Sequence, residues 1–142
     1  MLKTNVMITA LYIMSPGGLP VYYYDRVNKE DRLSDAILFT GLITAIKNFM
    51  TETQVGEPEQ VSTATRELYL KNTSCFSVVL IKELKDGIPI DIVKNLLTDL
   101  TTKIYDIIGD DEACNVMDEI QASMIRDLSD LVIEEWEKEF LD

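Results

Sequence analysis

Apolar and polar residues alternate along the chain with two different periods, and the first half of the chain mainly shows the strand period. Asn5–Met14 is apolar on both alternations, which predicts an interior strand covered on both faces. Ser15–Gly18 then provides a turn, with Gly17 expected at the positive φ of a type II turn. Leu19–Asp25 resumes as a strand, so the chain is predicted to open with a β-hairpin.

Further strand signals follow a polar loop that contains Gly56 and Pro58. Gln60–Arg66 and Glu67–Asn72 alternate apolar and polar residues, and they predict either two strands or one long bent strand. Cys75–Glu83 is the strongest strand signal after the first.

Three segments repeat their apolar residues with the helical period. The first is Ala36–Met50. The second runs from Pro89, which suits the first turn of a helix, to a C-terminal Gly109. The third covers about Cys114 to Phe140 and is acidic on its outer side.

The resulting order, β-β-α-β-β-β-α-α, predicts an α+β domain with an antiparallel five-stranded sheet and helices packed on its faces. We expect residues 1–142 to form a single domain, in which residues 110–142 are an acidic C-terminal helix extension.

The helix over Ala36–Met50 has an unusually wide apolar arc of roughly 200°, about twice what a helix lying on one sheet needs. Gly41 and Ala45 are expected to permit close approach to the chain's own sheet. The other apolar side then needs a second cover, which could be the last helix, a second copy or a partner. A partner could also displace the last helix. The polar strip of this helix is Thr40, Thr44, Lys47 and Asn48.

Charge is distributed unevenly. The chain has 25 acidic and 13 basic residues, a net charge of −12. Residues 110–142 carry 12 acids against Arg126 and Lys138, a balance of −10, and the first 109 residues balance to −2. The sequence lacks the clustered Lys and Arg that nucleic acids or anionic membranes require. The acidic segment is either a solvated helix face or a docking surface for a basic partner.

Candidate chemistry is sparse. Histidine is absent, which removes the commonest general base and the commonest metal ligand. Asp110–Glu112 lacks the alternating ligands and central glycine of a calcium loop. Tyr22–Tyr24 has no interleaved basic residue for base stacking, so its rings are expected to alternate across a strand. We therefore predict no enzyme, no cofactor and no metal site, leaving open a carboxylate pair brought together from distant positions.

Cys75 and Cys114 are isolated in sequence and are expected to be free thiols in a reduced cytosol rather than a disulfide. No membrane span or secretory signal is recognised, and the predicted location is cytoplasmic.

The order of elements and the segment Ile13–Val21, which contains Gly18-Leu19-Pro20, resemble the longin domain of the profilin-like group of folds. Glu67–Glu83 is similar to the paired later strands of that family. The related roadblock domains place a helix before the first strand. Here only four residues precede Asn5, which favours the longin pattern.

The resemblance implies an adaptor of membrane traffic and small-GTPase control, because longin domains bind segments along their first helix and pair into GTPase-binding platforms. Longin SNAREs continue into a heptad helix and an anchor, whereas this chain ends at Asp142, so a stand-alone archaeal-type longin protein is expected. The contact surface carried over is Phe39, Ile43, Ile46, Met50, Val61 and Thr63.

The predicted function is a non-catalytic adaptor that forms a homodimer, or a heterodimer with a related domain, and contacts a small GTPase or a trafficking-type partner. A first alternative is a monomeric peptide-binding module whose groove is covered by its own C-terminal helix. A second, from fold analogy alone, is a profilin-like actin binder.

Overall fold

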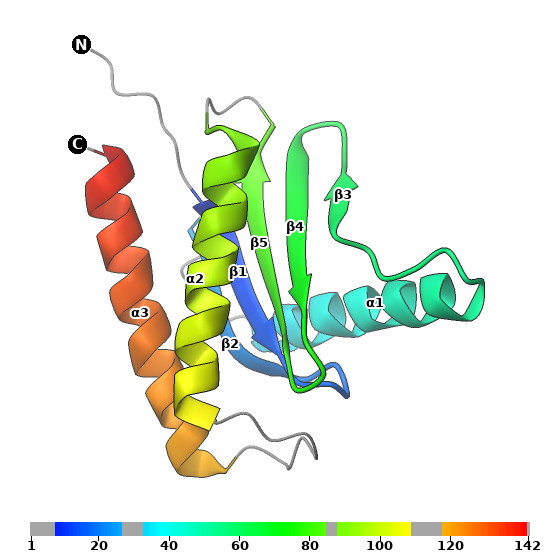
Figure 1. The fold of residues 1–142 in the computed structure, drawn as a ribbon, viewed down its shortest axis with the longest axis horizontal. Coiled ribbons are helices and arrows are strands. Elements are labelled where there is room, and N and C mark those ends of the chain that lie inside the picture. Colours follow the sequence, from blue (N-terminus) through cyan, green and yellow to red (C-terminus); the bar gives the residue numbers. More distant parts are fainter. Residues whose placement is uncertain (1–7, 27–32, 85–87, 109–117, 142) are drawn as a thin grey trace.

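The computed structural model describes residues 8–26, 33–84, 88–108 and 118–141. Within them, five antiparallel strands form one sheet with the order β2-β1-β5-β4-β3 (Figure 1). The strands are β1 (Ile8–Met14), β2 (Pro20–Asp25), β3 (Gln60–Ser62), β4 (Arg66–Asn72) and β5 (Ser77–Glu83). The order of elements and the α+β class agree with the sequence-based expectation.

Three helices cover the two faces unequally. α1 (Leu33–Glu52) lies across the strands on one face, and α2 (Ile90–Ile108) and α3 (Glu119–Leu141) lie side by side on the other (Figure 1). α2 packs on β4 and β5, and α3 packs on β2 and on α2.

Two hydrophobic clusters, one on each face, follow from the alternation of side chains along the central strands. The larger joins Leu11, Ile13, Val78 and Leu80 of the sheet to buried residues of α2 and α3. The smaller lies under α1 and includes the other parity of the same strands, such as Tyr12 and Val79. β1 is buried on both faces along Thr9–Met14, as its continuous apolar character predicted.

Gln60–Arg66 and Glu67–Asn72 resolve into two strands separated by a turn, of which the first is shorter than expected. β3 stops at Ser62 because Thr63 closes the turn: its Oγ1 accepts the Arg66 N–H at 3.0 Å, and its N–H donates to the Arg66 carbonyl at 2.8 Å. The hydrogen bonds of Thr63 in this turn take the place of further backbone hydrogen bonds between β3 and β4.

The hairpin between β1 and β2 uses its glycines differently from the prediction. The Gly18 N–H donates to the Ser15 carbonyl at 3.0 Å, which closes a turn around Pro16 and Gly17. The positive φ, 89°, belongs to Gly18, not to Gly17. Gly18 also needs to be small, because a Cβ there would lie 2.6 Å from Thr44 Oγ1 on α1. The hairpin tip therefore packs directly against α1.

The expectation of two free thiols is wrong for Cys75, which is disulfide-bonded. The other cysteine of the sequence, Cys114, and the acids Asp110–Glu112 lie outside the described residues. No helix in the described part of the chain is long and apolar enough to cross a membrane.

Candidate interaction surface on the first helix

The outer side of α1 carries a row of solvent-exposed apolar residues. Leu38, Leu42 and Phe49 are 72%, 58% and 66% exposed, which is far more than a covered helix would show. Gly41 and Ala45 lie between them and are exposed as well. We call this surface the α1 ridge, defined as Leu38, Gly41, Leu42, Ala45 and Phe49.

The ridge corrects the expected orientation of α1. Gly41 and Ala45 were expected to face the sheet, but a Cβ at Gly41 would meet no atom within 4 Å. The sheet-facing side is instead formed by Ala36, Thr40 and Ile43, all buried. The small residues therefore leave room above the helix, on its solvent side.

Polar contacts fix α1 in this orientation. Thr40 is fully buried, and its hydroxyl donates to the Ala36 carbonyl at 3.0 Å. Lys47 Nζ reaches across to β5 and donates to Ser77 Oγ at 2.7 Å. Burial lowers the pKa of Lys47, partly offset by the nearby Glu57 carboxylate. Half of the predicted polar strip thus points toward the sheet, and rotation of α1 would break the Lys47–Ser77 bond and move Thr40 out of the core.

The six residues of the predicted contact surface differ in how accessible the structure leaves them. Ile43 is 2% exposed and lies in the core, so a partner cannot reach it while α1 stays on its sheet. Phe39 packs on Tyr12 with ring centroids 4.4 Å apart. Ile46, Met50 and Val61 are half-buried, and Thr63 is exposed in the turn before β4.

The α1 ridge was not among the predicted contact residues, although helical spacing alone places its members on one side of α1. Each member lies three or four residues from another member, the spacing of one side of a helix. Phe39, Ile46 and Met50 share α1 with the ridge, whereas Val61 and Thr63 lie at the β3 end of the sheet.

The last helix does not cover this surface. The described part of α3 contacts α2 and β2, and its buried residues belong to the cluster on the other face of the sheet. The alternative of a groove closed by the chain's own C-terminal helix is therefore wrong. α3 is tied to β2 by two hydrogen bonds: Tyr22 Oη donates to Asp130 Oδ1 at 2.8 Å, and Tyr24 Oη donates to Glu137 Oε1 at 2.7 Å.

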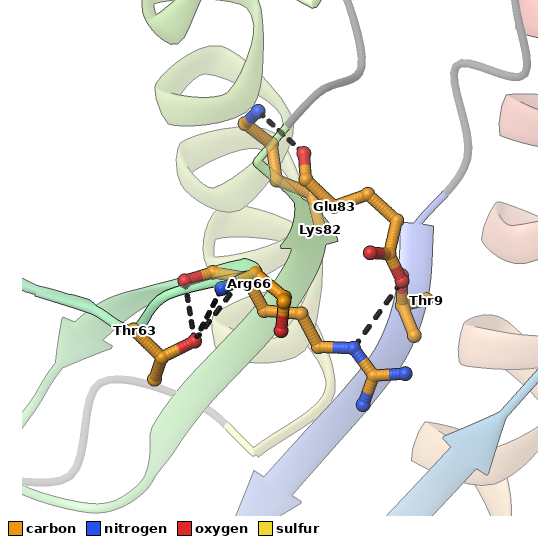
Figure 2. Close-up of polar contacts among 6 residues, drawn as sticks. Thr9, Thr63, Arg66, Lys82 and Glu83 are labelled. Atoms are coloured by element: carbon orange, nitrogen blue, oxygen red, sulfur yellow. Dashed lines mark hydrogen bonds and ion pairs between the residues drawn. The ribbon is translucent and has the colours of Figure 1, made fainter.

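A polar cluster lies at the ends of β4 and β5 (Figure 2). Glu83 Oε1 accepts from Arg66 Nε at 3.2 Å and from Thr9 Oγ1 at 3.3 Å. Lys82, next in the strand, points to the opposite face, where its Nζ lies 3.3 Å from Glu67 Oε1. The donors and acceptors satisfy one another, and the described residues hold no group of His, Cys, Asp or Glu suited to a metal ion.

Comparison with solved structures shows which fold this is. A roadblock/LC7 domain from Streptomyces avermitilis is similar with a TM-score of 0.59 and 11% identity, over 75% of this chain and 90% of that one. Myxococcus xanthus MglB is similar with a TM-score of 0.52 and 17% identity, over 73% of this chain and 86% of that one. The chain has the roadblock/longin fold. No protein-family model and no curated protein sequence matches it.

The comparisons agree with the sequence-based resemblance at the level of the fold. The first of these structures is a roadblock/LC7 domain, and the order of the described elements agrees with the order expected from the longin resemblance. At these identities the likeness concerns backbone architecture. Function has to be argued from the exposed surfaces of this chain.

Proposed function

We propose that this chain is a non-catalytic adaptor that self-associates through the α1 ridge and, once assembled, contacts a small GTPase or a trafficking-type partner. The observation that carries the self-association is the row of exposed apolar side chains on a helix whose other side is already buried. A monomer that leaves Leu38, Leu42 and Phe49 in water loses the free energy of burying them.

A second copy fits this surface because the ridge is self-complementary in shape. Gly41 and Ala45 are flanked by the larger Leu38, Leu42 and Phe49, so two antiparallel ridges can approach closely at the small residues while the large ones interlock beside them. A two-fold axis near Gly41 would bring Gly41 close to its own equivalent and would repeat every other contact twice, residue i with residue j and j with i, as isologous interfaces do. The predicted residues Phe39, Ile46 and Met50 would form the rim of that contact.

Val61 and Thr63 extend the proposed contact toward β3, the edge strand of the sheet. β3 has three residues, a length typical of edges that avoid uncontrolled pairing. We place these two residues at the periphery of the interface, because Val61 is half-buried in its own domain and Thr63 is engaged in the turn before β4.

The deciding experiment is the absolute mass in solution, measured by light scattering on a sizing column. We expect a dimer for the wild type and a monomer for Leu42→Glu, because two opposed carboxylates would be desolvated in the interface. The matched control is Asn95→Glu on the exposed side of α2, which should stay dimeric. A monomeric wild type, or a Leu42→Glu protein that remains dimeric with native circular dichroism, would refute self-association through the ridge.

Two substitutions at Gly41 distinguish effects on the stability of the domain from effects on the proposed dimer contact. Gly41→Ala should raise the stability of the domain by about 0.5–1 kcal/mol, because the helix propensity improves and the added Cβ meets nothing. Gly41→Leu should fold equally well but weaken the dimer, since the close approach of two helices is lost. Unfolding and mass measured on the same samples distinguish these effects.

The GTPase part rests on the longin resemblance. It is tested with wild-type and Leu42→Glu protein against small GTPases loaded with GDP or a GTP analogue, with binding and nucleotide exchange as readouts. Absence of both effects would remove that part while leaving the dimer intact. The archaeal-type origin and the cytoplasmic location remain predictions, and the Cys75 disulfide removes one reason for the latter.

A further inference from the structure

A second strip of exposed apolar residues lies on the outer side of α3, across the sheet from the α1 ridge. Ile120, Met124 and Leu131 are 73%, 49% and 58% exposed. Their separations of four and seven residues put them on one side of the helix, and we call them the α3 strip. The other side of α3 is anchored in the core by Ile125, Val132, Ile133 and Trp136. The α3 strip therefore faces solvent in the folded domain.

Negative charge accompanies this strip. α3 contains seven acidic residues against Arg126 and Lys138. Asp127 shares the side of the strip, between Met124 and Leu131, and Glu134 and Glu135 follow one turn later; all three are exposed. Within the described residues, no ion pair engages these three carboxylates. Their charge is available to a cation from outside the domain.

Two further carboxylates are held in place along one flank of the strip. Asp130 and Glu137 accept the hydroxyls of Tyr22 and Tyr24, which fixes their side chains beside β2. Each carboxylate has a second oxygen for another donor. Because these acids are ordered before any partner arrives, a cationic side chain binding there would lose less conformational entropy.

We propose that the α3 strip and its flanking carboxylates form a docking surface for a basic amphipathic helix of another protein. The apolar residues match a helical stripe with steps of three and four residues, and the carboxylates match Lys or Arg beside that stripe. The net charge of −12 steers a cationic partner toward the protein and repels an anionic one. A second copy is the wrong occupant, because it would bring the same acidic helix against this one.

Binding of a synthetic two-heptad helical peptide tests this assignment, with fluorescence anisotropy as the readout. One probe has Leu along one side and Lys elsewhere, and its counterpart has Glu in place of Lys. We expect the Lys probe to bind the full chain and the Glu probe not to bind. Ile120→Ser with Leu131→Ser, and separately Glu134→Lys with Glu135→Lys, should each weaken the Lys probe by about tenfold or more.

Matched controls locate the site. Leu19→Ser with Val55→Ser removes two exposed apolar side chains outside both the α3 strip and the α1 ridge, and Glu52→Lys with Glu59→Lys reverses two exposed acids away from α3. Both control proteins should bind the Lys probe within about twofold of the wild type. Failure of the wild type to bind, equal binding of both probes, or equal losses in the control and α3 variants would overturn the proposal. Because neither the test variants nor the control variants change the α1 ridge, this outcome is independent of the self-association test.

Discussion

The two faces of the sheet are covered in different ways. On one face α2 and α3 together bury a large cluster that runs from Leu11 and Leu80 to Trp136. On the other, α1 alone covers a smaller cluster around Tyr12 and Val79.

The single helix α1 leaves Leu38, Leu42 and Phe49 exposed in a row on its outer side. α3 also exposes apolar residues, Ile120, Met124 and Leu131, but acidic residues lie beside them. The two faces therefore present different surfaces to a neighbour, an apolar one on α1 and an apolar and acidic one on α3.

The two ion pairs at the ends of β4 and β5 repeat the contrast on a smaller scale. Figure 2 shows the more exposed pair, between Arg66 and Glu83. Lys82 and Glu67, whose side chains are 4% and 16% exposed, lie on the α2–α3 face. Arg66 and Glu83, both 45% exposed, lie on the α1 face. The same cross-strand chemistry is therefore enclosed on one face and solvated on the other, which determines how much each pair contributes to stability.

Truncation of an aromatic residue on each face should give the largest contrast. Trp136→Ala removes a side chain buried between α3 and the sheet and should cost about 3–5 kcal/mol in the free energy of unfolding. Phe49→Ala, on the α1 ridge, should change the stability of the monomer by no more than about 0.5 kcal/mol. Chemical denaturation over a range of protein concentrations separates this monomer value from any loss of dimer. Equal costs for the two variants would show that the ridge is packed within its own domain.

Breaking the two ion pairs should also destabilise the α2–α3 face more than the α1 face, but with a smaller difference in the free energy of unfolding. Glu67→Gln removes the carboxylate charge 3.3 Å from the enclosed Lys82 ammonium and should cost about 2–3 kcal/mol. The value lies at the low end for buried pairs because Lys82 Nζ also donates to the Glu83 carbonyl at 3.1 Å. Arg66→Gln should cost under about 1 kcal/mol, because that pair is exposed to solvent. Denaturation midpoints measured in one buffer would contradict this order if Arg66→Gln proved the more damaging change.

Much of the fold followed from periodicity. The apolar run of β1 on both alternations correctly predicted a strand between two layers, and the helical stripe before Gly109 predicted α2 closely. The predicted ends of strands and the predicted turn geometry were wrong where local hydrogen bonds determine the backbone conformation. Thr63 ends β3 after three residues, and Gly18 rather than Gly17 takes the positive φ. Such local bonds leave no periodic signal in the sequence.

The orientation of α1 could not be predicted, because the helix is apolar on two sides. Gly41 and Ala45 were expected to face the sheet, but that side carries part of the polar strip. Thr40 is buried with its hydroxyl bonded to the preceding turn, and Lys47 reaches Ser77. Short hydroxyl residues can enter a core in this way at little cost. Once the strip is placed inward, the ridge follows on the opposite side, and Ile43 becomes a core residue rather than a contact.

The attachment of α3 through the β2 tyrosines should produce a small effect at neutral pH and a pH-dependent one at alkaline pH. Burial, with the hydrogen bond to Glu137, raises the pKa of Tyr24 to about 12, and burial with the bond to Asp130 raises the pKa of Tyr22 as well. In the unfolded chain both phenols ionise near pH 10. The folded state therefore holds the protons more tightly, so stability is constant below about pH 10 and falls as the pH rises toward 12.

Tyr24→Phe should lose one hydrogen bond at neutral pH, worth about 1 kcal/mol, and should show a shallower decline above about pH 10. Urea midpoints of the wild type and the variant at several pH values measure the difference. The exposed-face variant Thr102→Val on α2, which touches no tyrosine hydrogen bond, should keep the wild-type slope. If Tyr24→Phe and the wild type decline in parallel, the bond to Glu137 does not hold α3 on β2, and the Tyr22–Asp130 bond and the apolar packing of α3 account for its position.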